Sequence, residues 1–349
     1  HGVKAVGGCC GTTPAFIKAI HEAFEGKKYC RQNPNIPAAV CTPEKTIIID
    51  QPRIIGERIN PTGKKKLKEA LKNGDMDYVL TQAADQIRDG AEILDVNAGV
   101  PGIDEKSVIV NIVKALQGIT DAPLQIDSGD PEVIEAALRV YSGKAIVNSV
   151  NGEEKSLASI LPLVKKYGAA VVGLTLDEDG IPTTKEKRIE IAERILSRAL
   201  ALGIPRKDVY IDCLTLTVSA EQENAAGTLE AIKYVKEELG LKTVLGVSNI
   251  SFGLPNRSII NHNFLQMALT CGLDLPIMNP GSAEMMQAVA VYKLIMNIDK
   301  GSMAYIKNYS GEVVTSTVSG NPTSAEKPQQ ESEVEYAINN GLGAKCREL

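Results

Sequence analysis

Carboxylate and amide side chains recur along this sequence at one kind of position, directly after a short apolar run. Ten residues share this placement: Glu57, Asn60, Asp95, Asn97, Asp127, Asn148, Asp177, Asp212, Asn249 and Asn279. A carboxylate accepts two parallel N–H bonds, and an asparagine offers one donor group and one acceptor to neighbouring atoms of a ligand. These residue types indicate a binding site for a molecule that is rich in hydrogen-bonding groups.

The apolar runs that carry these residues alternate with helical segments from about residue 54 to residue 300, which is the pattern of parallel strands covered by helices. The eight predicted strands are RIIGERIN (53–60), EILDVNAG (92–99), PLQIDS (123–128), AIVNSV (145–150), AVVGLTLDE (170–178), VYIDCLTLT (209–217), TVLGVSNI (243–250) and LPIMNPG (275–281). Eight units in about 250 residues fit a closed barrel. An open doubly wound sheet usually has about five or six strands, and no GxGxxG opens a helix here. We therefore predict an α/β protein with a (β/α)8 TIM barrel.

In such a barrel the carboxyl ends of the strands meet at one mouth, so the ten polar residues become neighbours. Unpaired polar groups buried there would cost about 1–3 kcal/mol each, and a ligand with many donors relieves that cost. The edge of a pterin ring offers suitable donors and acceptors. No glycine-rich phosphate loop and no basic cluster is evident at the predicted mouth, which disfavours a nucleotide or a sugar phosphate.

Composition excludes several other classes of partner. The 349 residues include 38 Lys and Arg against 43 Asp and Glu, for a net charge of −5, and they contain no Trp. This balance argues against nucleic acid. No apolar run approaches the roughly 18 residues of a membrane span. The seven cysteines are scattered and odd in number, which indicates no disulfide framework and favours a reducing cytoplasm.

Four segments are predicted along the chain. Residues 1–28 contain a strand, VKAVGG (3–8), and a helix, TPAFIKAIHEAFEGKK (13–28), which cannot bury their own apolar faces and so call for a partner domain. Residues 29–53, rich in proline, are predicted as an interdomain linker, and residues 54–307 as the barrel. Residues 308–349 turn polar and then regain helical character, as expected of a linker leading to another module.

Several motifs carry a resemblance to a known family. They are GERIN-PTG (56–63), LDVNAG (94–99), IDS (126–128), VNSVNG (147–152), DCL (212–214) and GVSNISFGLPNR (246–257). In this order they resemble the pterin-binding barrel shared by cobalamin-dependent methionine synthases and corrinoid protein methyltransferases. HGVKAVGGCCGTTPAFI (1–17) is similar to the end of the homocysteine-binding barrel of the same synthases, which favours the methionine synthase family.

The resemblance implies roles for individual residues. Asp127, Asn148 and Asp212 would hold the pyrimidine edge of the pterin. Asn249 would lie near N5, the nitrogen that carries the methyl group, as the catalytic residue, while Glu57, Asn60, Asp95 and Arg257 would line the same mouth. Cys9 and Cys10 would ligate zinc together with a third cysteine that lies upstream of this sequence.

The activity implied is that of a 5-methyltetrahydrofolate–homocysteine methyltransferase that depends on cobalamin. Its N5 methyl group would pass to cob(I)alamin on another module during methionine synthesis from homocysteine. The implied partners are methyltetrahydrofolate, a cobalamin-binding module and a homocysteine-binding barrel. A corrinoid iron–sulfur protein methyltransferase, a non-catalytic folate-binding fragment and a dihydropteroate synthase-like enzyme stay open as alternatives. The last usually carries two glycines before an acidic residue in its second strand, where this sequence has DVNAG.

Transfer of a methyl group from a tertiary amine requires positive charge on N5, so we expect Asn249 to accept a hydrogen bond from protonated N5. Because no histidine lies at a predicted strand end, the proton is expected from solvent or a water chain. Three other features have simpler interpretations. Asp177 opens DEDG, which is typical of a turn; KKKLK (64–68) is a solvated helix face; and Cys213 and Cys271 belong to the core.

Overall fold

Eight parallel strands form a closed barrel in the computed structural model, which describes residues 3, 5–28 and 36–310. The strands are β3 (Ile55–Ile59), β4 (Ile93–Val96), β5 (Leu124–Asp127), β6 (Ile146–Asn151), β7 (Ala170–Leu174), β8 (Val209–Asp212), β9 (Lys242–Gly246) and β10 (Leu275–Met278). They follow one another around the barrel in chain order, and β10 closes it by pairing with β3. Each strand overlaps one of the eight predicted runs, so the (β/α)8 prediction is confirmed.

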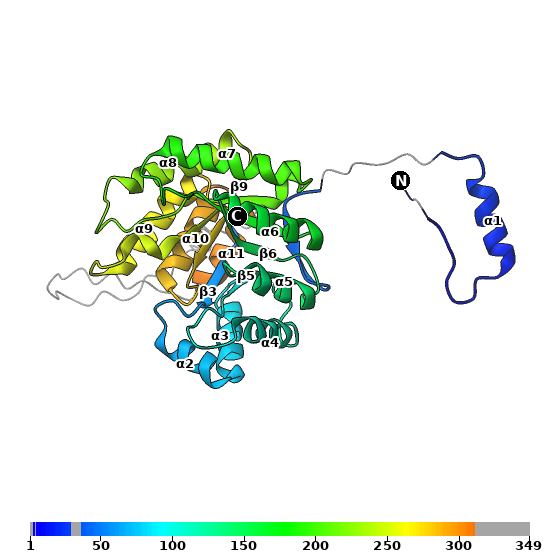
Figure 1. The fold of residues 1–349 in the computed structure, drawn as a ribbon, viewed down its shortest axis with the longest axis horizontal. Helices are drawn as coiled ribbons and strands as arrows, with labels where there is room; N and C mark the ends of the chain where they lie inside the picture. The colour runs from blue at the N-terminus through cyan, green and yellow to red at the C-terminus, as the bar shows by residue number, and fades with distance from the viewer. Residues whose placement is uncertain (1–2, 4, 29–35, 311–349) are drawn as a thin grey trace, which may run out of the picture. The chain divides into compact units, whose positions relative to one another are not determined.

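Helices surround the strands (Figure 1). They are α2 (Lys65–Asn73), α3 (Met76–Arg88), α4 (Glu105–Gln117), α5 (Pro131–Val140), α6 (Glu154–Tyr167), α7 (Lys185–Ala201), α8 (Asn224–Glu237), α9 (Arg257–Thr270) and α10 (Ala283–Ile295). Short 3₁₀ turns lie at Arg206–Asp208, at Val247–Ser251 (η2) and at Lys300–Ser302. Local sequence sets the helix ends, because the Asp130 carboxylate caps α5 and Gly168 ends α6 in a left-handed conformation, with φ of 66°.

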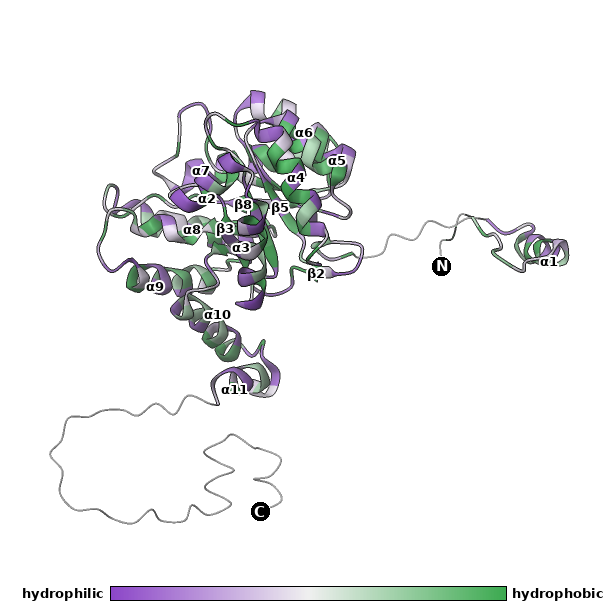
Figure 2. Cartoon of the chain, turned by 90° about the horizontal axis from the view of Figure 1, so that it is seen from below, coloured by the Kyte–Doolittle hydropathy of each residue, from purple (hydrophilic) through white to green (hydrophobic). Residues whose placement is uncertain are grey.

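The core lies between the strands and the helices and also fills the barrel interior. All four residues of β4 are buried, as expected for a parallel strand that is covered on both faces. The helices are amphipathic, and Figure 2 shows hydrophilic and hydrophobic residues together on α5 and α6. This packing holds the carboxyl ends of the strands as a rigid rim.

A short hairpin covers the amino-terminal end of the barrel. Strands β1 (Ala39–Cys41) and β2 (Thr46–Ile48) pair in antiparallel fashion within the segment 29–53, which the sequence predicts to be a linker. Val40, Ile47 and Ile49 are buried in one cluster with residues near the start of the barrel strands, among them Ile55 and Ile93. Backbone hydrogen bonds between Cys41 and Lys144 fasten the hairpin to the loop before β6. We call residues 38–49 the floor of the barrel.

Helix α1 (Pro14–Phe24) forms as predicted, and none of its residues is buried. The strand predicted at residues 3–8 is wrong for the described positions, since Val3 and residues 5–8 have no strand conformation. A strand needs a neighbour for its backbone hydrogen bonds, and the described chain offers none here.

At the other end, α11 (Met303–Tyr309) is followed by residues 311–349, so the prediction of a polar linker and helix lies outside the described residues. Among the helices that are described, none combines the length and the apolar character that a bilayer crossing needs.

Candidate functional site

A cavity of about 690 Å³ opens at the carboxyl ends of the barrel strands. Its lining includes the eight residues that the resemblance places at the mouth, namely Glu57, Asn60, Asp95, Asp127, Asn148, Asp212, Asn249 and Arg257. Asn279 lines it as well. Residues as far apart in sequence as Glu57 and Asn279 thus meet in one pocket, because the closed barrel brings the strand ends together.

The buried carboxylate of Asp95 and the half-buried carboxylate of Asp127 share a network of side-chain amides at β3, β4 and β5. Asn60 Nδ2 donates to Asp127 Oδ2 at 2.9 Å and lies 3.3 Å from Asp95 Oδ2. Asn97 Nδ2 also donates to Asp127 Oδ2, at 3.1 Å, and Gln125 Nε2 donates to Asp95 Oδ1 at 2.7 Å. These bonds leave Asp127 Oδ1 as an acceptor at the cavity.

Burial makes these carboxylates poor anions in the free protein. Loss of solvation raises the pKa of Asp95 to about 6, although bonds from Gln125 and Asn60 oppose the rise. The pKa of Asp127 is raised well above its usual range, first by burial and then by the charge of Asp95. A ligand that donates N–H bonds to these oxygens would favour their charged forms.

Asp212, at the end of β8, is a third carboxylate of the cavity and is buried, with 7% of its surface exposed. The Leu214 N–H donates to its Oδ1 at 2.7 Å. Burial raises the pKa of Asp212 to about 7, against the opposing effects of the backbone N–H groups of Leu214 and Gly246 and of the positive charge of Arg188. The cavity therefore presents three carboxylates that ionise near neutral pH or that a ligand must help to ionise.

Three cations also line the cavity, namely Arg58, Lys64 and Arg257, so the expectation of no basic cluster at the mouth is wrong. Lys64 was predicted to lie on a solvated helix face, but its Nζ donates to the carbonyl oxygens of Glu57 and Asn60, at 3.0 Å each. It precedes α2, so its side chain turns back toward the strand end. Burial lowers the pKa of Lys64.

The segment after β9 forms the opposite rim. Asn249 lies exposed in η2, and the absence of a side chain at Gly246 leaves room for its amide, because a Cβ there would lie 3.0 Å from Asn249 Nδ2. Arg257, at the start of α9, donates to Ser251 Oγ at 2.9 Å and to the Ser248 carbonyl at 2.8 Å. Its guanidinium also lies 4.5 Å from the ring centroid of Phe252.

Phe252 and Lys64 are cavity residues that sequence reasoning did not single out. For Phe252 a signal was available, since it is the one aromatic residue in the GVSNISFGLPNR motif. For Lys64 no such signal was visible, because it stands in a run with Lys65 and Lys66, whose side chains are indeed exposed.

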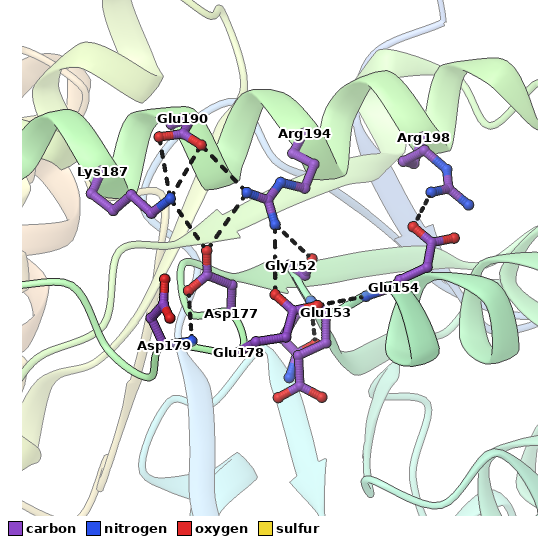
Figure 3. A network of polar contacts seen from close by, with 11 residues as sticks. Gly152, Glu153, Glu154, Asp177, Glu178, Asp179, Lys187, Glu190, Arg194 and Arg198 are labelled. Carbon is purple, nitrogen blue, oxygen red and sulfur yellow. Dashed lines mark hydrogen bonds and ion pairs between the residues drawn. The ribbon is translucent and has the colours of Figure 1, made fainter.

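Asp177 does not line this cavity. It belongs to a separate network of polar contacts with α7, shown in Figure 3. Its carboxylate is buried and lies 3.5 Å from Lys187 Nζ and 3.6 Å from Arg194 Nη2, both of α7. Its Oδ1 accepts the N–H of Asp179, as in the predicted turn. Arg194 also donates to the Gly152 carbonyl at 3.2 Å, so this network ties the β7–α7 turn to the end of β6.

The two predicted zinc ligands lie together and exposed, with the sulfur atoms of Cys9 and Cys10 3.9 Å apart. Two sulfurs each about 2.3 Å from one tetrahedral zinc ion lie about 3.8 Å apart, so the pair fits such an ion. Within the described ranges, no group of three or more His, Cys, Asp or Glu side chains is placed to hold a metal. The pair alone offers fewer than the three protein ligands of a usual catalytic zinc site.

Comparisons with known proteins agree with this geometry. The family described as pterin binding enzyme matches residues 56–279, and the homocysteine S-methyltransferase family matches residues 1–24. Methionine synthase of Mycobacterium tuberculosis is 35% identical over 294 residues, and that of Mycobacterium leprae is 33% identical over 303. Each alignment covers 80% of this chain and 25% of the relative, so the chain spans about a quarter of the length of these proteins.

Solved structures show the same fold at low sequence identity. A Xanthomonas albilineans dihydropteroate synthase with 4-aminobenzoic acid superposes with a TM-score of 0.59 and 19% identity, over 75% of this chain and 99% of that one. A Yersinia pestis enzyme of the same name, with a pterine–sulfa conjugate, gives 0.57 and 17%, over 74% and 99%. At this identity the likeness concerns the barrel fold alone.

Proposed function

Since the chain belongs to the pterin-binding enzyme family, we propose that its mouth binds 5-methyltetrahydrofolate and presents the N5 methyl group to cob(I)alamin. The observation that carries the proposal is the set of three carboxylates around one cavity, of which Asp95 and Asp212 are buried and Asp127 is half-buried. The relatives named methionine synthase support the wider reaction, the synthesis of methionine from homocysteine. That reaction would also need a cobalamin-binding module and a homocysteine-binding barrel.

The chain's own residues would grip the pterin by its pyrimidine edge. Asp127 Oδ1 and the carboxylate of Asp212 can each accept further N–H bonds, while the amide of Asn148 can supply a donor and an acceptor. Asn60 and Asn97 hold the other oxygen of Asp127 and so fix the plane of its carboxylate. A flat ring held in this way would have a defined orientation toward the exposed rim.

Asn249 would act at the reacting nitrogen from that rim. Its exposed side chain has no hydrogen-bond partner in the part of the chain that the structure describes, so its oxygen is available to accept from a protonated N5. Bound cob(I)alamin would supply the nucleophile that takes the methyl group. None of the cavity-lining residues is a histidine, which supports solvent or a water chain as the proton source.

Methylcobalamin formation tests the proposal directly. The chain is mixed with 5-methyltetrahydrofolate and free cob(I)alamin in a stopped-flow instrument, and the absorbance of methylcobalamin is followed. We expect formation that saturates with folate concentration. Folate binding without methylcobalamin at any concentration would leave the alternative of a non-catalytic folate-binding fragment.

Two enzymatic alternatives have their own assays. A dihydropteroate synthase-like activity would condense a pterin pyrophosphate with p-aminobenzoate, and the fold likeness is what favours it. A corrinoid iron–sulfur protein methyltransferase would use a different corrinoid carrier. The match of residues 1–24 to the homocysteine S-methyltransferase family favours methionine synthesis over both.

We further propose that residues 1–28 are the end of a homocysteine-binding barrel and that residues 29–53 connect it to the pterin barrel. The exposed apolar side chains of α1, among them Phe16 at 62% and Phe24 at 51%, suit a helix that packs against more of such a barrel. Residues 308–349 would lead toward a cobalamin module. The scattered odd cysteines support a cytoplasmic location for the enzyme.

Zinc retention tests the proposed role of Cys9 and Cys10. Because two thiolates are too few for a tight site, we expect dialysed chain of residues 1–349 to hold zinc weakly and below stoichiometry. Atomic emission measures the metal, with the Cys9→Ser, Cys10→Ser double variant as the control. One tightly held zinc ion per chain would contradict this expectation.

Folate affinity is expected to rise with pH. Burial raises the pKa of Asp95 to about 6 and that of Asp212 to about 7, so both carboxylates become good acceptors only as pH rises through these values. The contribution of these two groups to ligand-free stability should change in the opposite direction: their folded pKa values exceed the unfolded ones, so this contribution is fully present below about pH 4 and is lost by about pH 8. Calorimetric titrations and urea unfolding measure the two trends. A dissociation constant that stays constant between about pH 5 and pH 8 would contradict the proposed contacts.

A further inference from the structure

A fully buried arginine lies behind the mouth without a carboxylate bonded to it. Arg188 of α7 has 0% of its surface exposed, and its Nη1 donates to Thr228 Oγ1 at 2.7 Å. Its Nε and Nη2 have no hydrogen-bond partner among the described residues. Burial of a guanidinium in this state is unfavourable, so the presence of an arginine at this position requires an explanation beyond packing.

Thr228 connects this arginine to the segment after β8. Thr228 lies on α8 and is also fully buried. Its hydroxyl lies 3.0 Å from the Leu214 carbonyl oxygen and 3.1 Å from that of Asn224, so it can donate to either while it accepts from Arg188. A side chain of α8 therefore holds the Leu214 carbonyl in place.

Leu214 has an unusual backbone conformation at this point. Its φ is +57°, in the left-handed region that is unfavourable for a residue with a Cβ. The Leu214 N–H donates to Asp212 Oδ1 at 2.7 Å, and the left-handed conformation sets the direction of the Leu214 carbonyl relative to that N–H. Such a conformation persists only where its surroundings hold it, and Thr228 is the side chain that bonds the same residue's carbonyl.

We propose that Arg188 and Thr228 are positioning residues for Asp212, acting through the Leu214 peptide. The proposal rests on the proposed function, in which Asp212 accepts N–H bonds from the pterin. Thr228 fixes the turn that aims one N–H at the carboxylate and leaves it able to accept further N–H bonds from ligand. Arg188 fixes the Thr228 hydroxyl and places a positive charge behind the same carboxylate.

The charge of Arg188 would also influence the pH at which Asp212 ionises. Burial raises the pKa of Asp212, and the Leu214 and Gly246 N–H groups and then the charge of Arg188 oppose that rise. Cys213 and Glu221, on the segment that follows β8, are the other titratable groups whose charges act on Arg188. Strands β7 and β9 contribute no titratable side chain at this end, since Leu174 and Gly246 end them. Removal of Arg188 should thus favour the neutral form of Asp212.

The first test is a comparison of threonine variants in the chain of residues 1–349. Thr228→Val removes the hydroxyl at nearly constant shape and is expected to raise the Kd for 5-methyltetrahydrofolate about tenfold, whereas Thr228→Ser should stay within about twofold. Thr243→Val is the matched control, because Thr243 is a buried hydroxyl at the start of β9 that donates to the Gly272 carbonyl at 2.8 Å, far from the mouth. It should lower Tm and leave the Kd unchanged.

The second test is the pH dependence of binding. In Arg188→Met the pH at which affinity rises should move upward by about one unit. In Arg188→Lys, which keeps the positive charge, most of this shift should be absent. A merely structural arginine would lower Tm without moving this pH. If Arg188→Met fails to fold, the threonine comparison decides alone.

The outcomes separate the inference from the function on which it rests. An unmodified chain that binds no folate overturns both. Folate binding by the unmodified chain, with an unchanged Kd in Thr228→Val or an equal loss in Thr243→Val, overturns the positioning role and leaves the proposed function standing. A loss confined to Thr228→Val, with recovery in Thr228→Ser, supports it.

Discussion

Replacement of Asn249 by alanine is expected to slow methyl transfer about 100-fold or more while folate affinity changes by less than about threefold. The amide lies on the exposed rim of the cavity and makes no other side-chain bond within the described residues, so its loss disturbs little else. Its proposed bond to N5 strengthens as that nitrogen gains charge, which makes the effect larger in the transition state than in the bound substrate. Single-turnover stopped flow gives the rate, and calorimetry gives the Kd.

Asn263→Ala provides a control, because Asn263 lies exposed on α9 and donates to the Ile259 carbonyl outside the cavity. It should leave both quantities unchanged. Equal losses of rate and affinity in Asn249→Ala would mean that this residue only holds the ligand. Stabilisation of the charge on N5 in the transition state would then require another group near that nitrogen.

Asp127→Ala is expected to weaken folate binding by about 2–3 kcal/mol, or about 30- to 150-fold, with the fold intact. The carboxylate proposed to accept charge-assisted N–H bonds would be gone, and the Asn60 and Asn97 amides would lose their acceptor. Stability should be little affected or improved, because burial raises the pKa of Asp127 and thus disfavours its charge in the free protein. Calorimetry measures binding, and circular dichroism with thermal unfolding checks the fold.

A control for this variant is Asp121→Ala. Asp121 lies on the loop before β5, toward the opposite end of the barrel, and pairs with Lys45 at 3.3 Å. Its removal should leave the Kd unchanged. If Asp127→Ala itself binds folate with unchanged affinity, Asp127 has no place in the site.

The barrel was predictable because its signal is repeated. Each strand is a short apolar run such as ILDV (93–96), and eight of them alternate with helices, so errors at single boundaries do not alter the fold. The polar residues after the runs were predictable as cavity residues for the same reason, since strand ends of a closed barrel converge. Their chemical roles stay predictions.

Other features depend on tertiary contacts that local sequence does not reveal. Lys64 stands in a run of lysines and is distinguished only by where its side chain turns, and Arg188 stands in the charged segment KEKRIE, where its burial has no local sign. The strand expected at residues 3–8 had suitable residue types but no neighbour. The hairpin at β1 and β2 is short and lies among prolines, which masked its apolar alternation.

The floor of the barrel limits the routes by which a ligand can enter and leave the cavity. Val40, Ile47 and Ile49 fill the amino-terminal end of the barrel, so folate could not leave at that end. Substrate, product and corrinoid would all have to use the opening at the carboxyl ends of the strands. Demethylated folate could then depart only after the corrinoid carrier has moved aside.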